Sequence, residues 1–213
     1  MRADFGAKEL VLYHYWRSSS SWRVRWALEC KKLKPQFVHV DLLSGEVDRE
    51  PHLSRNPMGQ VPVLKVDGRH LVESVAIVEW LEEVVPEPLL YKGDAFSRAH
   101  IRALCELINA GTQPIQNLNV MDRYSEDPGK RKEWSQFFIR RGLNAFQRLA
   151  TTRAGTFSVG DSITAADLFL VPQCYNALRF EIDLSEFPLI RRIYENASAT
   201  TEAKLSAPDN YKL

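Results

Sequence analysis

The pattern of hydrophobic residues in this 213-residue sequence changes near Pro88. Before that point, short apolar runs typical of strands alternate with the one-sided apolar pattern of helices, and after it only the helical pattern occurs. Strands confined to one end of a chain have to pair with one another, so they belong to one domain. We therefore predict an α/β domain over residues 1–86 and, after a short linker, an all-helical domain over residues 92–213.

The first domain has the element order of a thioredoxin-like fold. Strand-like runs lie at residues 10–15, 36–41, 61–66 and 71–72. Helical patterns lie at residues 22–32 and 74–85. Asp67-Gly68, between the last two runs, favours a type I′ hairpin turn. The expected N-caps are Ser20 or Ser21 for the first helix and Ser74 for the second.

The second domain is expected to be helical throughout. Helical periodicity covers residues 95–124, 130–151, 164–180 and 187–199. Thr164 and Asp167 have the spacing of a capping box at the start of the third stretch. Pro114 lies inside the first stretch, where its ring would kink a helix.

Composition and charge exclude several classes of function. A net charge of +1 argues against binding to nucleic acid, which requires a concentrated basic face. The three cysteines are far apart and the five histidines show no paired spacing, so we expect buried structural thiols and no metal site. The N-terminus has no signal pattern and no apolar run reaches membrane-spanning length, which favours a cytoplasmic protein with no membrane partner.

Four consecutive serines, Ser18–Ser21, lie between the first predicted strand and the first predicted helix. Serine side chains bury no apolar surface, so packing of the core does not explain the run. Serine hydroxyls can donate hydrogen bonds, and the first N–H groups of a helix have no partner within the helix. The helix dipole also favours negative charge at this end. The run therefore predicts a corner that binds an anion.

Arg17–Arg25 and several further segments between Leu10 and Pro188 resemble the zeta class of the glutathione transferases, the class that includes the maleylacetoacetate and maleylpyruvate isomerases. The segment Arg17–Arg25 is similar to the zeta signature Ser-Ser-Cys-x-x-Arg-Val-Arg, with Ser20 where that pattern has cysteine. Further matches lie at residues 56–57, 60–62, 73–74, 113–118, 159–167 and 176–180. The resemblance implies a glutathione transferase fold, glutathione as cofactor, a small dicarboxylate substrate and a homodimer.

The resemblance places the catalytic centre at the serine run, with Ser18, Ser19 and Ser20. Ser18 aligns with the residue that activates the sulfur of glutathione. Lowering a thiol pKa by about 2 units requires roughly 2.7 kcal/mol of preferential thiolate stabilisation. One hydroxyl hydrogen bond of about 1.5–3 kcal/mol and a helix end of about 0.3–1 kcal/mol suffice. Because glutathione would supply the sulfur, Ser20 can serve as a secondary donor in place of the cysteine.

Seven residues are implied to bind glutathione, namely Gln60, Val61, Pro62, Glu73, Ser74, Gln113 and Asn117. A cis bond before Pro62 would present the main chain of Val61 to the cysteinyl unit, although the local pattern alone also fits an edge-strand proline. Glu73 and Ser74 would hold the ammonium and the carboxylate of the γ-glutamyl end. Gln113 and Asn117 are expected on one helical face.

Arg17 and Arg179 are implied to face the substrate carboxylates, because a guanidinium offers a planar fork of donors. A surface or salt-bridged arginine is the alternative for each of them. Arg23 and Arg25 are expected to anchor the structure through carboxylates instead.

The activity that the resemblance implies is the glutathione-dependent cis–trans isomerisation of maleylacetoacetate to fumarylacetoacetate, in tyrosine and phenylalanine breakdown. The sequence leaves open maleylpyruvate as the substrate, and also a transferase or dehalogenase activity on small α-halo acids. A non-catalytic binding protein on the same fold is disfavoured, because Ser18, Glu73 and Ser74 are all present.

Overall fold

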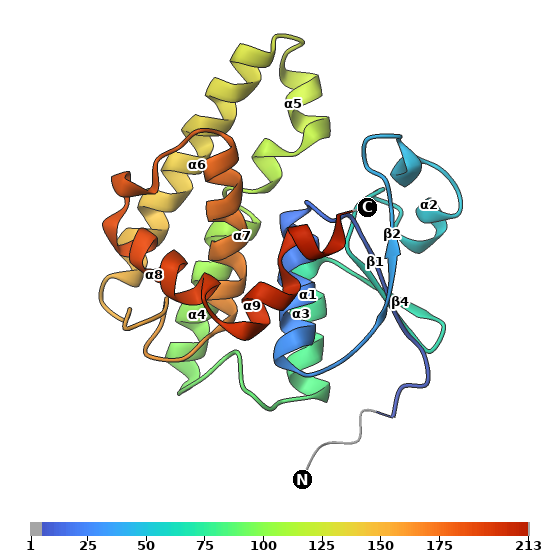
Figure 1. Cartoon of the computed structure of the whole chain (residues 1–213), viewed down its shortest axis with the longest axis horizontal. Helices are drawn as coiled ribbons and strands as arrows, with labels where there is room; N and C mark the ends of the chain where they lie inside the picture. Colours follow the sequence, from blue (N-terminus) through green and yellow to red (C-terminus); the bar gives the residue numbers. More distant parts are fainter. Residues whose placement is uncertain (1–5, 213) are drawn as a thin grey trace. The chain divides into compact units, whose positions relative to one another are not determined.

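The computed structural model describes residues 6–212, which form two compact units. The first unit contains the described residues up to Leu89 together with the segment that starts at Thr201, and the second contains Leu90–Thr200. The elements of both units are drawn in Figure 1. The predicted combination of an α/β part and an all-helical part is confirmed.

The first unit is built on a four-stranded mixed sheet. Its strands are β1 (Leu10–His14), β2 (Gln36–His39), β3 (Val63–Val66) and β4 (Arg69–Val72), in the spatial order β2-β1-β3-β4. β1 is parallel to β2 and antiparallel to β3, and β3 is antiparallel to β4. Asp67 and Gly68 both have positive φ, at 45° and 80°, as the predicted type I′ turn requires.

The helices of the first unit pack around this sheet. They are α1 (Ser19–Cys30), α2 (His52–Arg55), α3 (Ser74–Val84) and α9 (Thr201–Ser206), with 3-10 turns η1 (Glu46–Asp48) and η4 (Pro208–Tyr211). α1 packs against α3. The core is formed by fully buried side chains of the sheet and of both helices, including Leu12, Val24, Trp26, Leu64, Ile77 and Leu81.

Both predicted N-caps in this unit lie earlier in the chain than expected. α1 begins after Ser18, whose hydroxyl accepts a hydrogen bond from the N–H of Ser21 at 3.1 Å. The N-cap of α3 is Glu73, so Ser74 is its first helical residue. The apolar pattern marks the buried face of a helix, and the first turn of α1 consists of serines that lie outside that pattern. In α3 the apolar pattern begins at Val75, one residue after the helix itself starts.

The C-terminal segment lies with the first unit, although we predicted it within the helical domain. α9 runs beside α1 (Figure 1). The indole Nε1 of Trp22 donates to the hydroxyl of Ser206 at 3.1 Å, and Nε of Arg25 donates to the carbonyl of Ser206 at 3.0 Å. Both donors are on buried side chains of α1, so α9 supplies acceptors that they need.

The second unit is helical apart from one isolated bridge between Ala154 and Gly160. Its elements are α4 (Ala95–Asn109), η2 (Pro114–Gln116), α5 (Leu118–Tyr124), α6 (Pro128–Ala150), α7 (Ala165–Arg179), η3 (Leu184–Glu186) and α8 (Pro188–Ser198). α7 is almost completely buried and packs against α4, α6 and α8. Its capping box is confirmed, because the carboxylate of Asp167 accepts from the N–H of Thr164 at 2.8 Å.

The predicted helix over residues 95–124 is broken into three elements. α4 ends at Asn109, and Pro114 starts η2, a position where a helix does not need the N–H that proline lacks. Thr112, in the break, packs directly against α6 at Gly142. A Cβ atom at Gly142 would lie 2.0 Å from the hydroxyl oxygen of Thr112, so this close approach requires glycine.

Candidate active site

Three separate segments meet at one end of the sheet in the first unit. Tyr13 near the end of β1 lies opposite Val63 at the start of β3, and Val63 lies opposite Val72 at the end of β4. The chain that follows β1, precedes β3 and follows β4 therefore emerges at the same end. These are the segments that carry Ser18, Val61-Pro62 and Glu73-Ser74 in the sequence analysis.

Ser18 is held at the N-terminus of α1 by two hydrogen bonds. Its N–H donates to the carbonyl of Tyr15 at 3.1 Å, and its hydroxyl oxygen accepts from the N–H of Ser21 at 3.1 Å. Because this bond uses the oxygen as an acceptor, the hydroxyl proton remains to be donated to an anion. Ser19 and Ser20 are the first two residues of α1, and its first turn contains no acidic side chain to oppose the helix dipole.

The peptide bond between Val61 and Pro62 is cis, as the resemblance implied. Val61 is buried, and neither its N–H nor its carbonyl has a hydrogen-bond partner within residues 6–212. Buried main-chain groups are nearly always paired, so this pair of groups is suited to a bound backbone. The preceding carbonyl, of Gln60, accepts from His52 Nε2 and Asn56 Nδ2, each at 3.0 Å.

His52 was not identified from the sequence. Its ring is buried, and it holds a carbonyl beside the cis bond. No spacing or neighbour distinguishes it from the other histidines, so no local signal could have found it.

The start of α3 combines an exposed carboxylate with a buried hydroxyl. Glu73 has φ 66° and ψ 118°, a conformation unusual for a residue with a side chain, and no side chain caps the helix. Ser74 is 4% exposed, and its hydroxyl accepts from Nη1 of Arg23 at 3.0 Å. The proton of that hydroxyl is therefore available to an anionic acceptor at the uncapped N-terminus of α3.

Arg25 differs from the prediction, which anchored it through carboxylates. Arg23 contacts the hydroxyl of Ser74, and Arg25 donates to main-chain oxygens, with no carboxylate among its partners in the described chain. Burial lowers the pKa of Arg25 to about 10, so the side chain stays charged at neutral pH. Arg17 is half-buried, with its guanidinium carbon 5.5 Å from the ring centroid of Trp16.

The remaining predicted site residues belong to the second unit. Nε2 of Gln113 donates to Oδ1 of Asn117 at 2.5 Å, so these two side chains are brought together. They do so across η2, which Gln113 precedes and Asn117 follows, and not along one α-helix. Arg179 is the exposed last residue of α7, with Nη1 3.4 Å from Oδ1 of Asn176.

The cysteines of the described chain lie in the interior. Cys30, Cys105 and Cys174 are buried and form no disulfide within residues 6–212, and burial raises the pKa of Cys174. Within residues 6–212, no three His, Cys, Asp or Glu side chains are grouped so that they could hold a metal ion. Over the same range, every helix is too short or too polar to span a membrane.

Two family models match the chain. The one described as "Glutathione S-transferase, N-terminal domain" matches residues 8–83, and the one described as "Glutathione S-transferase, C-terminal domain" matches residues 115–204. The chain is also 42% identical over 202 residues to probable maleylacetoacetate isomerase 2 of Drosophila melanogaster, which covers 94% of this chain and 88% of that protein.

Solved structures agree with these matches. Maleylacetoacetate isomerase from Anaeromyxobacter dehalogenans 2CP-1, with bound GSH in the active site, has a TM-score of 0.87 and 50% identity, covering 94% of this chain and 95% of that one. Its structure with bound dicarboxyethyl glutathione and citrate has a TM-score of 0.86 and 49% identity over the same shares. The holo structure of a zeta-class maleyl pyruvate isomerase has a TM-score of 0.90 and 33% identity, covering 93% and 96%.

Proposed function

This chain belongs to the glutathione S-transferase family, among the maleylacetoacetate isomerases of the zeta class, and we propose that it isomerises maleylacetoacetate to fumarylacetoacetate with glutathione as cofactor. The observation that carries the proposal is the hydrogen bonding of Ser18. Its oxygen already accepts from Ser21, which leaves its proton available to a bound sulfur anion.

The groups at the end of the sheet fit the parts of glutathione. The unpartnered N–H and carbonyl of Val61, held in place by Gln60 and Pro62, suit the main chain of the cysteinyl unit. The hydroxyl of Ser74 and the uncapped start of α3 suit the γ-glutamyl carboxylate, and the exposed Glu73 suits its ammonium. We assign further polar contacts with the same ligand to Gln113 and Asn117.

The residues of this chain have separate tasks in the reaction. When bound, glutathione supplies a thiolate that adds to the cis double bond, allows rotation about the resulting single bond and leaves as the trans product forms. Ser18 donates its proton in a hydrogen bond to the sulfur, and Ser19 and Ser20 add the donors of the first turn of α1. Arg17 and Arg179 bind the carboxylates and stabilise negative charge that develops on the substrate.

The proposed substrate follows from the relatives. Identity to the named maleylacetoacetate isomerases is 42% and 50%, against 33% to the maleyl pyruvate isomerase. A dicarboxylate fits because the Anaeromyxobacter protein binds dicarboxyethyl glutathione. We therefore place maleylpyruvate second. We also infer a homodimer in the cytoplasm, on the family expectation alone, which sedimentation equilibrium and cell fractionation would test.

The decisive experiment compares substrates with and without glutathione. Purified protein should convert maleylacetoacetate to the fumaryl product only when glutathione is present, and should regenerate the glutathione. Maleylpyruvate and dichloroacetate, assayed in parallel, measure the isomerase and dehalogenase alternatives. Absence of any glutathione-dependent product from maleylacetoacetate would show that the proposal is wrong.

A further inference from the structure

Arg25 connects the C-terminal segment to the loop that carries Ser18. Its guanidinium is fully buried in the first unit. On one side Nη2 donates to the carbonyl of Trp16 at 3.0 Å and Nη1 contacts the carbonyl of Tyr15 at 3.4 Å. On the other side Nε donates to the carbonyl of Ser206 at 3.0 Å. One side chain therefore joins two segments that are far apart in the sequence.

The link from Arg25 to Ser18 passes through a single oxygen atom. The carbonyl of Tyr15 that faces Arg25 also accepts the N–H of Ser18, at 3.1 Å. A displacement of the guanidinium would therefore shift this carbonyl, and with it the N-cap residue of α1. Misplacement of a catalytic group by about 1 Å can lower a rate by about a hundredfold.

Residues 201–212, which we call the C-terminal strap, hold Arg25 from the opposite side. The ring of Tyr211 lies over the guanidinium, 4.6 Å from its central carbon, and Nζ of Lys212 lies 5.5 Å from the ring centroid of Trp16. Aromatic rings stabilise a buried cation at such distances. The strap therefore contacts both Arg25 and Trp16, the loop residue whose carbonyl accepts from Arg25.

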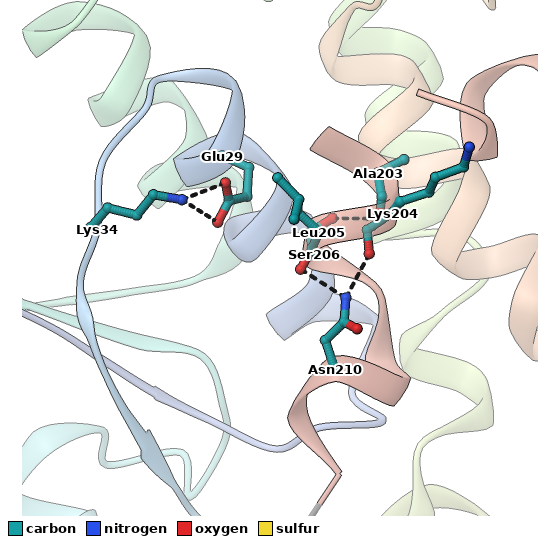
Figure 2. Close-up of polar contacts among 7 residues, drawn as sticks. All are labelled: Glu29, Lys34, Ala203, Lys204, Leu205, Ser206 and Asn210. Carbon is teal, nitrogen blue, oxygen red and sulfur yellow. Dashed lines mark hydrogen bonds and ion pairs between the residues drawn. The ribbon is translucent and has the colours of Figure 1, made fainter. Parts of the chain in front are cut away.

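The strap has its own internal hydrogen bonds, which place Tyr211. Figure 2 shows the side-chain amide of Asn210 donating to the carbonyls of Lys204 and Leu205, at 2.7 and 3.1 Å. These bonds fold η4 back onto the end of α9. In the same view the hydroxyl of Ser206 donates to the carbonyl of Ala203, at 3.0 Å.

We propose that Arg25 is a positioning residue for Ser18, and that the C-terminal strap keeps Arg25 in its working position. The inference rests on the proposed function, because it takes Ser18 as the group that stabilises the thiolate. It adds a role for residues outside the set that we assign to glutathione and substrate. Loss of the strap should therefore weaken ionisation of the bound thiol before it weakens binding.

The test removes the strap contact without altering Arg25 or Ser18. Tyr211→Ala removes the ring from the guanidinium, and a chain ending at residue 207 removes η4 altogether. In both, the pKa of the bound glutathione thiol, measured from thiolate ultraviolet absorption as a function of pH, should rise by about one unit. At a pH below that value kcat should fall about tenfold, while KM for glutathione changes less than about twofold.

Matched variants separate positioning from loss of structure. Tyr211→Phe keeps the ring, and Lys34→Met breaks the exposed ion pair with Glu29 on α1 that Figure 2 also shows. Both should retain the thiol pKa of the parent protein. Arg25→Lys keeps the positive charge but loses the planar set of guanidinium N–H donors. It should raise the pKa of the bound thiol at least as much as Tyr211→Ala does. Circular dichroism at the assay temperature measures the folded fraction of every variant.

Two outcomes would overturn the inference, and they can be told apart. In the first outcome, the parent protein lowers the pKa of the bound thiol, and Tyr211→Ala and the shortened chain lower that pKa by the same amount. The strap then has no positioning role, and the proposed function stands. If the parent protein binds glutathione without lowering the thiol pKa, the proposed function and this inference both fail. A loss of kcat that matches the loss of folded protein, with an unchanged thiol pKa, counts as the first outcome.

Discussion

The guanidinium of Arg23 donates a hydrogen bond of 3.0 Å to the hydroxyl of Ser74 and so joins α1 to the first residue of α3. Both side chains are buried. α1 and α3 are the two helices that start at the candidate active site, one after Ser18 and the other after Glu73. The bond therefore holds both helix N-termini at one end of the sheet, and it uses the acceptor side of the Ser74 hydroxyl.

Replacement of Ser74 by alanine should weaken glutathione binding with little change in kcat. A hydrogen bond to a charged group contributes about 1.5–3 kcal/mol, which corresponds to a rise of about tenfold to a hundredfold in Kd or KM. Steady-state kinetics with glutathione as the varied component measure this. Ser54→Ala, at an exposed serine of the same unit whose hydroxyl donates to the carbonyl of Pro51, is the control. An unchanged KM in Ser74→Ala would contradict the assignment of Ser74 to the γ-glutamyl carboxylate.

Replacement of Ser18 by alanine should lower kcat/KM for isomerisation at least about tenfold, because about 1.4 kcal/mol corresponds to one decade in rate. Ser20→Ala, one residue inside α1, should lower it less, since we assign that hydroxyl a secondary role. The two variants are compared in one glutathione-dependent assay at a single pH. Equal losses, or full activity in Ser18→Ala, would rule out Ser18 as the residue that acts on the sulfur.

Stability should fall at acid pH because of His14. Burial, and then the charge of Arg25 at 3.2 Å from Nδ1, lower the pKa of His14 from 6.5 to about 3. Between these values the unfolded chain binds the proton and the folded chain does not. The contribution of neutral His14 to the free energy of unfolding is therefore complete above pH 6.5 and is lost as the pH falls toward 3. By pH 5.5 the free energy of unfolding should have fallen by about 1.4 kcal/mol.

The measurement for His14 is the free energy of unfolding in urea at pH 8 and at pH 5.5. His14→Gln provides an oxygen that can accept from Arg25 without titrating, so its stability should change less between the two pH values. His70→Gln is the control, because His70 is exposed and burial lowers its pKa by less than it does that of His14. If His14→Gln loses as much stability at pH 5.5 as the parent protein, His14 is not the group responsible.

Replacement of Asp167 by alanine should destabilise the second unit by about 2–4 kcal/mol. The carboxylate is fully buried and accepts from the N–H groups of Ser158 and Thr164, each at 2.8 Å, and both donors would lose their partner. Urea unfolding measures the effect. Asp183→Ala removes an exposed carboxylate that accepts from Ser185 at 2.8 Å, and its loss should stay below about 1 kcal/mol. Similar losses in the two variants would contradict the capping argument.

Features that depend on near neighbours were predictable. The four strands, the positive φ values at Asp67 and Gly68 and the capping box at Thr164 each follow from residues within one turn or one strand. Helix ends were less predictable. The start of α1 at Ser19 and the end of α4 at Asn109 lie where polar residues carry no periodic signal, so the apolar pattern misplaced them.

The sequence by itself determined the division into a sheet-containing part and a helical part, and it identified Ser18, Val61-Pro62 and Glu73-Ser74 as the residues to examine. Only the tertiary structure decided the distant partners of Arg23 and Arg25, which include a hydroxyl 51 residues away and a carbonyl 181 residues away. Periodicity reports contacts within one element. A buried guanidinium must be satisfied by whichever acceptors the packing brings to it, and those acceptors leave no local pattern.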